Sequence, residues 1–202
     1  MSDLRSAVAL TMALTACSPA PDETNGAETR AQAPAPPAAV DRLSEKPASA
    51  ARAAVFTELD SAKCRVVEEN KEEGPYWLRR CPGHAGWKLD WSESDLRQGL
   101  SLISPGRRET ELRLSDLVAN GAFNSLGKTV EWRGPSGAGP DAMIVRTNVA
   151  NGAEPERPDI SRLAVVRLIE TPCLVAVVDP GPDQNEKARS IADGSMSSCV
   201  DE

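Results

Sequence analysis

The chain has 202 residues, 23 Lys and Arg against 30 Asp and Glu, a formal net charge of −7 and only 3% aromatic residues. The acidic excess is spread along the sequence, and no basic stripe is present to displace counterions, which argues against a nucleic-acid partner. No segment approaches the roughly 20 consecutive apolar residues that a membrane-spanning helix needs.

The N-terminal segment has the pattern of an export signal. Residues 6–16 (SAVALTMALTA) form a short apolar run that ends in small residues, as a signal-peptide cleavage site does. The segment Leu14–Cys17 (LTAC) resembles the lipobox of bacterial lipoproteins. The resemblance implies a signal peptide over residues 1–16 and a diacylglyceryl group on Cys17 that anchors the protein to the lipid bilayer. An ordinary secretory signal with a Cys near its end is the alternative.

The residues after the lipobox predict the membrane in which the protein is anchored and a linker that follows the anchor. Ser18 follows the cysteine, and lack of Asp at this place in similar Gram-negative lipoproteins goes with the outer membrane. The resemblance thus implies a protein anchored in the cell envelope and facing the periplasm. Residues 17–52 are rich in Ala and Pro and contain no aromatic residue, so we interpret them as lipid anchor and disordered linker. Residues 53–202 are predicted to form one domain.

The other four cysteines predict two disulfides, because exported chains fold in an oxidising compartment. We favour Cys64 with Cys81 and Cys173 with Cys199, since each pair brackets one local unit. Loops of this length make a bridge worth about 3 kcal/mol. Other connectivities stay open, and zinc is the competing interpretation, although the spacings contain no CxxC.

Strands are predicted from period-two alternation, or from apolar and β-branched runs between Gly, Pro or Asn, over residues 64–69, 76–81, 87–91, 96–103, 129–133, 142–149, 163–169 and 173–178. The first two are expected to form a hairpin closed by the first disulfide. The turn at 92–95 should lead into a strand with Leu96, Leu100 and Leu102 on one face. The continuous run 173–178 predicts a central strand covered on both faces.

Two helices complete the predicted fold. Ser115 and Asp116 offer a cap for about two turns of helix before Gly121. The run after Asp183 has Glu186 at capping-box spacing and ends at Gly194, with one small apolar side formed by Ala188, Ile191 and Ala192. The sequence therefore predicts an α+β fold in which a mostly antiparallel twisted sheet has the C-terminal helix packed on one face.

Several strings along the folded part resemble an uncharacterised family of secreted domains from Gram-negative bacteria. They are CRVVEENKEEG, CPGHAGW, DLRQGL, EWRG and PGPDQNEKARSIAD, spread over most of residues 57–200. The family carries no assigned activity. The resemblance therefore implies the domain boundary and the exported setting, and no site residue.

No cofactor and no metal site are predicted. His84, the only histidine, lies in CPGHAG, which is typical of a turn. The Gly-rich segment 134–140 precedes a strand rather than a helix, so we interpret it as a hairpin loop and not as a phosphate cradle. The acidic residues at 68, 69, 72 and 73 match no calcium-loop spacing and are interpreted as a solvated hairpin.

Two groups of side chains are candidates for function. Asp90, Glu93 and Asp95 lie close together in the sequence and could supply the two carboxyls of a glycosidase. The four tryptophans could form a stacking platform for sugars, but a core cluster is favoured because two of them share a face with Leu89. They are Trp77, Trp87, Trp91 and Trp132.

Taken with the export signal, this pattern favours an envelope lipoprotein that acts as a non-catalytic binding or interaction module for a protein or a cell-envelope polymer. One alternative is a carboxylate-dependent hydrolase of envelope glycans, with Asp90, Glu93 or Asp95 as acid and base. Another is a small periplasmic inhibitor or folding accessory.

Overall fold

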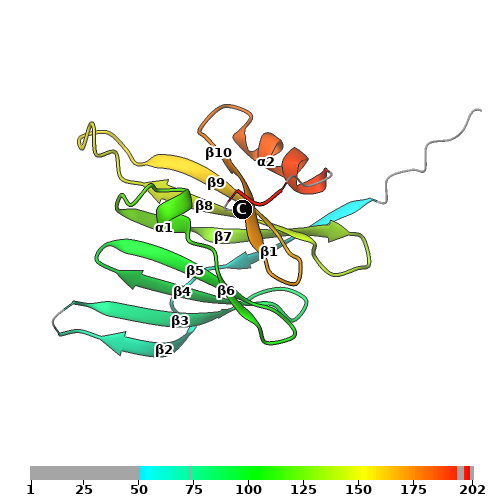
Figure 1. Cartoon of the computed structure of the whole chain (residues 1–202), viewed down its shortest axis with the longest axis horizontal. Helices are drawn as coiled ribbons and strands as arrows, with labels where there is room; N and C mark the ends of the chain where they lie inside the picture. The colour runs from blue at the N-terminus through cyan, green and yellow to red at the C-terminus, as the bar shows by residue number, and fades with distance from the viewer. Residues whose placement is uncertain (1–50, 73, 195–197, 201–202) are drawn as a thin grey trace, which may run out of the picture. The chain divides into compact units, whose positions relative to one another are not determined.

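The computed structural model describes residues 51–202 except 73, 195–197 and 201–202. Cys17, the predicted signal peptide and nearly all of the predicted linker lie outside the described residues. Within them the elements are β1 (Arg52–Glu58), β2 (Arg65–Asn70), β3 (Tyr76–Pro82), β4 (Lys88–Ser94), β5 (Arg97–Ile103), β6 (Glu109–Glu111), α1 (Leu114–Leu117), β7 (Asn124–Pro135), β8 (Ala142–Val149), β9 (Ile160–Arg167), β10 (Cys173–Val178) and α2 (Gln184–Asp193) (Figure 1). β1 begins at Arg52, one residue before the predicted domain boundary.

The strands of the described residues belong to one sheet, and this confirms the mostly antiparallel α+β fold. Their order is β10-β9-β8-β7-β5-β4-β3-β2, with β1 also paired to β7 and β6 to β5. The β5–β7 pair is parallel and is registered only at Arg97 opposite Asn124. Because β5 and β7 diverge from that point, the sheet divides into one part with β2–β6 and another with β1 and β7–β10 (Figure 1).

The main apolar core joins the two parts of the sheet. Leu89 of β4 and Leu100 of β5 pack in the same cluster as Trp132 of β7, Met143 of β8 and Val166 of β9. All five side chains are at most 1% exposed. Their removal from water is the main stabilisation of the fold, at about 25 cal/mol per Å² of apolar surface.

Helix α2 covers the opposite face of β8–β10, as predicted for the C-terminal helix (Figure 1). Ala188 and Ala192 are fully buried against this face. The predicted capping box is not formed, because the side chain of Asp183 makes no capping hydrogen bond. Buried Gln184 instead donates to the carbonyl oxygens of Ser161 at 2.7 Å and Val178 at 2.9 Å, which fixes the start of the helix on β9 and β10.

The two predicted disulfides are both present. Cys64–Cys81 joins the segment before β2 to β3, and Cys173–Cys199 joins the first residue of β10 to the C-terminal segment. The backbone N–H of Val200 donates to the carbonyl oxygen of Leu174 at 2.8 Å. The second disulfide therefore holds the end of the chain against the outer edge of β10.

Three local predictions differ from the structure. β10 pairs only with β9 and is not central, although Leu174 and Val175 are buried in clusters on opposite faces, which accounts for the apolar run. Leu96 is 64% exposed, because it lies with Asp95 in a tight turn where both residues have positive φ. Helix α1 has only four residues and contains Ser115, which was expected as its cap.

Candidate functional site

A row of four side chains crosses the first part of the sheet from strand to strand. Glu69 of β2 lies opposite Trp77 of β3, Trp77 lies opposite Glu93 of β4, and Glu93 lies opposite Gln98 of β5. Directly opposed side chains have Cβ atoms about 4.5–5.5 Å apart. The indole of Trp77 therefore has a carboxylate on each side. We call these four residues the Trp77 row.

The tryptophans divide into two buried and two half-buried residues. Trp87 and Trp132 are 9% and 1% exposed, which confirms their predicted place in the core. Trp77 and Trp91 are half-buried, and their ring centroids are 4.9 Å apart with the planes at 89°. The guanidinium carbon of Arg79 lies 5.3 Å from the Trp77 ring centroid. Edge-to-face and cation–π contacts thus fix the orientation of the Trp77 indole.

Gln98 connects the row to the rest of the sheet. Its Oε1 accepts hydrogen bonds from Trp91 Nε1 at 3.2 Å and from the backbone N–H of Leu126 at 2.8 Å. Its Nε2 donates to Glu93 Oε2 at 2.7 Å. One amide side chain therefore holds both an indole and a carboxylate, which makes this end of the row rigid.

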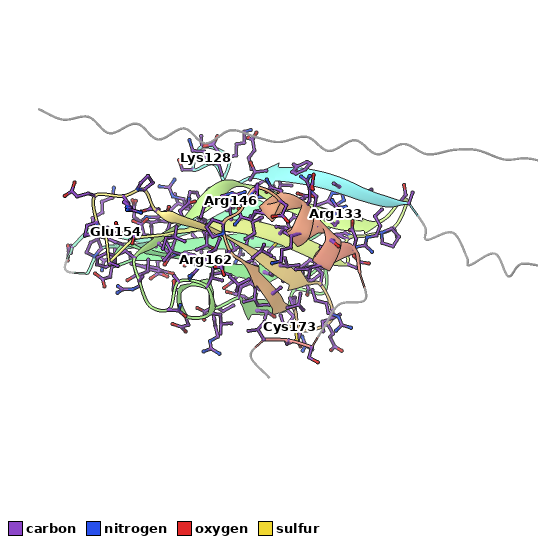
Figure 2. The ribbon with its side chains drawn as sticks, turned by 90° about the horizontal axis from the view of Figure 1, so that it is seen from above. Lys128, Arg133, Arg146, Glu154, Arg162 and Cys173 are labelled. Atoms are coloured by element: carbon purple, nitrogen blue, oxygen red, sulfur yellow. A yellow bond between two sulfur atoms is a disulfide. The ribbon has the colours of Figure 1, made fainter. Side chains whose placement is uncertain are left out.

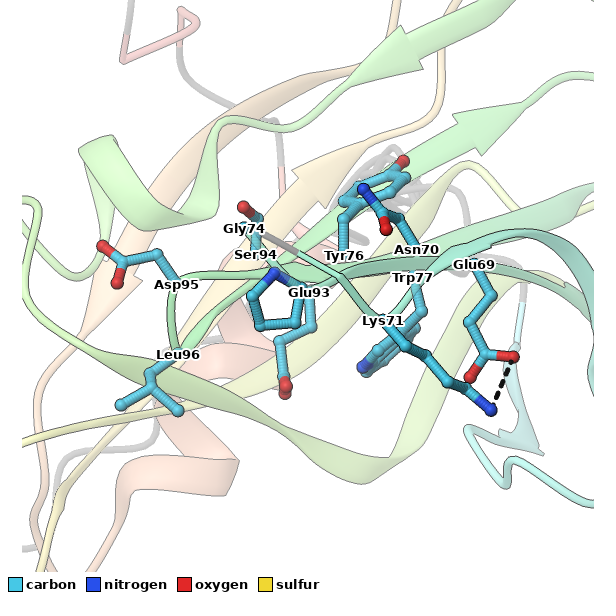
Figure 3. Close-up of a pocket in the computed structure, with 11 residues that line it drawn as sticks. Glu69, Asn70, Lys71, Gly74, Tyr76, Trp77, Glu93, Ser94, Asp95 and Leu96 are labelled. Carbon is cyan, nitrogen blue, oxygen red and sulfur yellow. Dashed lines mark ion pairs between the residues drawn. The ribbon is translucent and has the colours of Figure 1, made fainter.

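Two pockets open beside these residues. The first has a volume of about 330 Å³ and is lined by Trp77, Glu93, Glu69, Lys71 and Asp95 among others (Figure 3). Of its three carboxylates, Glu69 pairs with Lys71 and Asp95 pairs with Arg97, so Glu93 is the main acidic group beside Trp77. Figure 3 shows Trp77, Glu93 and the Glu69–Lys71 ion pair on one side of the strands, with the Asp95 carboxylate directed away.

The second pocket has a volume of about 580 Å³ and is lined by Trp91 and Gln98 together with Glu58, Asp60 and Lys128. Trp77 and Glu93 therefore line one pocket, while the groups they contact, Trp91 and Gln98, line the other. The arrangement offers a half-buried indole with carboxylates on both sides, which suits reversible binding.

The three carboxylates suggested for catalysis have separate environments. Asp90 is 2% exposed, and its two oxygens accept from Arg80 Nε at 2.7 Å and Arg80 Nη2 at 2.5 Å. Asp95 lies in the tight turn after β4 and pairs with Arg97. Only Glu93 belongs to the Trp77 row. The structure therefore does not bring the three carboxylates together.

The remaining sequence candidates occupy loops. His84 lies in the turn between β3 and β4, where its carbonyl oxygen accepts from Trp87 N at 3.0 Å. The Gly-rich segment 134–140 ends β7 with its first two residues and forms the hairpin loop between β7 and β8 with the rest, as predicted for the loop. Among the described residues, no group of three His, Cys, Asp or Glu side chains is arranged to hold a metal ion.

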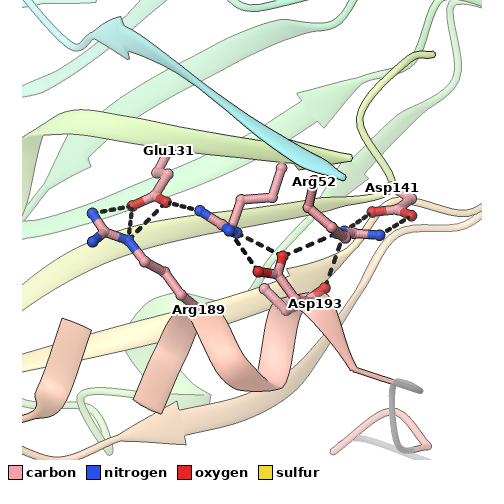
Figure 4. A network of polar contacts seen from close by, with 7 residues as sticks. Arg52, Glu131, Asp141, Arg189 and Asp193 are labelled. Carbon is pink, nitrogen blue, oxygen red and sulfur yellow. Dashed lines mark hydrogen bonds and ion pairs between the residues drawn. The ribbon is translucent and has the colours of Figure 1, made fainter. Parts of the chain in front are cut away.

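A network of ion pairs on the other part of the sheet was missed by the sequence analysis (Figure 4). Arg133, at its centre, is labelled in Figure 2. Arg133 of β7 donates to both oxygens of Asp193, at 2.7 and 2.5 Å, and to Glu131 at 2.6 Å. Arg52 of β1 donates to Asp193 at 3.0 Å and also binds Asp141, while Arg189 of α2 donates to Glu131 at 2.9 Å. The hydrogen bonds from Arg133 lower the pKa of Asp193 below its ordinary range. Because every charge has a partner, we assign this network to holding β1 and α2 on β7.

Comparison with protein-family models, curated proteins and solved structures gives no match to the chain. In the described part of the chain, no helix is long and apolar enough to cross a membrane. Because no relative is found, the Trp77 row is interpreted from its own geometry.

Proposed function

We propose that the chain is an exported lipoprotein, anchored through Cys17 in the outer membrane and facing the periplasm, whose folded domain binds a protein or a cell-envelope polymer without catalysis. The lipobox resemblance of Leu14–Cys17 supports the anchor. The half-buried Trp77 between Glu69 and Glu93 supports the binding role and is the observation that carries it.

The physical case for binding starts from the exposed surface of the indole. Indole surface left in water costs free energy, which a ligand that covers it would recover at about 25 cal/mol per Å². Trp91, Arg79 and Gln98 already fix the neighbouring side chains, so little conformational entropy is lost when a ligand binds. Trp is one of the residue types enriched among those that dominate binding energy.

The acidic lining determines which chemical groups fit beside the indole. Carboxylates accept hydrogen bonds from hydroxyl, amine and guanidinium groups, and Glu69 and Glu93 lie on the two sides of the indole. Hydroxyl-rich sugars and Lys- or Arg-bearing protein segments both meet this requirement, whereas anionic ligands would be repelled. The proposed ligand is therefore neutral or basic at the point of contact.

Binding to isolated cell-wall polymer and to detergent-solubilised envelope proteins tests this proposal with the lipidated full chain. We expect Trp77→Ala to weaken binding by about tenfold or more. Ile169→Ala is the control, because Ile169 is a 44% exposed apolar residue between β9 and β10, in the part of the sheet that does not contain the Trp77 row. If Trp77→Ala binds as tightly as the unmodified chain, the Trp77 row is not the binding site. Turnover of a cell-wall substrate by the purified protein would favour the hydrolase alternative.

The anchor is tested separately in the native host. Labelled palmitate should appear on the unmodified chain and not on Cys17→Ser. If the unmodified chain carries no label, the lipoprotein assignment fails, while the binding role of the Trp77 row would stand on the first experiment.

A further inference from the structure

In the part of the chain that the structure describes, strand β1 has one paired edge and one open edge. All seven of its residues are registered against β7, from Arg52 opposite Pro135 to Glu58 opposite Thr129, without a bulge. Within the described residues, no backbone group is hydrogen-bonded to its other edge. The centre of the strand is apolar and exposed, with Val55 at 37% and Phe56 at 55%.

The other outer strands each carry a feature that discourages further pairing. β2 has a register shift after Val66 and the acidic residues Glu68 and Glu69. β6 has only three residues. β10 has a register shift after Leu174, and the carbonyl oxygen of Leu174 is occupied by Val200 N–H. Open edges are normally protected in one of these ways, because they pair readily with another chain. β1 carries none of them at its centre.

The sequence of β1, RAAVFTE, is complementary to itself in antiparallel orientation. We propose that β1 pairs with β1 of a second copy of this chain, centred on Val55. In this register Val55 faces Val55 of the second copy, Ala54 faces Phe56 of the second copy, and Arg52 faces Glu58 of the second copy.

This register is favoured because it uses the whole strand and places opposite charges together at both ends. Centring the pair on Ala54 or on Phe56 leaves one end of each strand unpaired and removes the Arg52–Glu58 match. Directly opposed charges and β-branched or aromatic pairs each contribute roughly 0.2–1 kcal/mol. Arg52 keeps its ion pairs with Asp141 and Asp193, and Glu58 keeps its ion pair with Lys63. Arg52 and Glu58 of the two copies therefore act on each other only by charge proximity.

The expected dimer is small and reversible. A single pair of seven-residue strands buries less surface than the roughly 1,200 Å² of a stable protein–protein interface, so dissociation in the micromolar to millimolar range is expected. The pairing would make one continuous sheet from β10 of one copy to β10 of the other.

Sedimentation equilibrium of the full chain carrying Cys17→Ser, which prevents lipidation, tests the proposal. We expect a monomer–dimer equilibrium that Val55→Lys weakens at least about tenfold, because two like charges then lie directly opposite each other. Ile169→Lys is the matched control, since Ile169 is 44% exposed and lies between β9 and β10. A chain that stays monomeric up to about 1 mM would overturn the proposal.

Crosslinking fixes the register independently. Val55→Cys places the two sulfurs next to each other at the two-fold axis, within reach of a short bis-maleimide. Ala53→Cys, on the same strand face, places the two sulfurs about four residues apart along the strands, which is roughly 13 Å. We expect covalent dimers from Val55→Cys and few from Ala53→Cys. Equal crosslinking of both variants, or a dimer unaffected by Val55→Lys, would assign the contact to another surface.

Discussion

Asp90 and Glu93 lie on opposite faces of β4. Asp90 faces Arg80, which binds both of its oxygens in a buried position, while Glu93 lies beside Trp77 and accepts from Gln98. Two carboxyls that act together in hydrolysis must face one substrate. Their separation by the sheet therefore gives the two residues different roles, a structural one for Asp90 and a binding one for Glu93.

The structural role of Asp90 predicts a loss of stability without a loss of binding. Asp90→Asn should lower the free energy of unfolding by about 2 kcal/mol, less than the loss of a fully buried partner, because Arg80 is 32% exposed and can reach water. Urea denaturation followed by tryptophan fluorescence measures this. Asp95→Asn, at a 78% exposed carboxylate, should change the value by less than about 0.5 kcal/mol. A larger loss of stability from Asp95→Asn than from Asp90→Asn would contradict the structural role of Asp90.

The ion-pair network predicts acid sensitivity through Asp193. Its folded-state pKa lies below the ordinary value of 3.8, first because of hydrogen bonds from Arg133, so folding favours the ionised form. The resulting stability is present above pH 3.8 and is lost as the pH falls through the folded-state pKa. Denaturation curves of the unmodified chain and Asp193→Asn should differ at neutral pH and converge below that range. The exposed Asp159→Asn provides the control, and a pH-independent difference would contradict the assignment.

The single tyrosine reports on the Trp77 end of the sheet. Tyr76 lines the first pocket, and burial, followed by the charges of Glu68, Asp90 and Glu109, raises its pKa above 10.0. Ultraviolet titration of the phenolate should therefore give a higher midpoint in the folded chain than in denaturant. Because Tyr76 is the only tyrosine, no other phenol contributes to the signal. Identical midpoints in the two states would show that Tyr76 is solvated as in a free peptide.

The second disulfide predicts a stability change at the edge of the sheet. Replacing Cys173 and Cys199 together by Ser should lower the free energy of unfolding by about 2–4 kcal/mol. Hydrogen exchange should be faster at the Val200 N–H, which bonds to Leu174 at 2.8 Å. Amides of β3 and β4 lie in the other part of the sheet and serve as internal controls. Unchanged exchange at Val200 would show that the terminal segment is held by other contacts.

The elements with a strong local pattern could be predicted from the sequence. The Trp87–Trp91 alternation and the helix after Asp183 each carry their signal within a few residues, and both are found. The cysteine pairs are 17 and 26 residues apart, but few pairings are possible and the favoured one is present. β1 was missed because RAAVFTE does not alternate, and its order comes from pairing with β7, more than seventy residues further along the chain. Leu96 was wrongly predicted to lie on the apolar face of a strand. The turn was expected at residues 92–95, but β4 continues to Ser94, and the positive φ values place the turn at Asp95 and Leu96.

The candidate site was beyond sequence reasoning for a different reason. The residues of the Trp77 row come from four strands, and the β2–β3 register shift after Val66 decides that Glu69, and not Glu68, lies opposite Trp77. A shift of one residue would turn the other face of β2 towards the row. The Arg133–Asp193 pair likewise depends on where α2 lies on the sheet. The sequence could show only that Glu131 and Arg133, two residues apart in β7, lie on the same face of the strand.

Arg52 is the first residue of the first strand, and it is held by Asp141 and by Asp193. The chain enters the sheet at this position. A tension applied along the chain from the N-terminal side, in the direction of β1, would meet this clamp and load the seven β1–β7 register pairs in shear. Shear geometry shares the force among all the pairs, so mechanical resistance would be concentrated at the entry point of the domain.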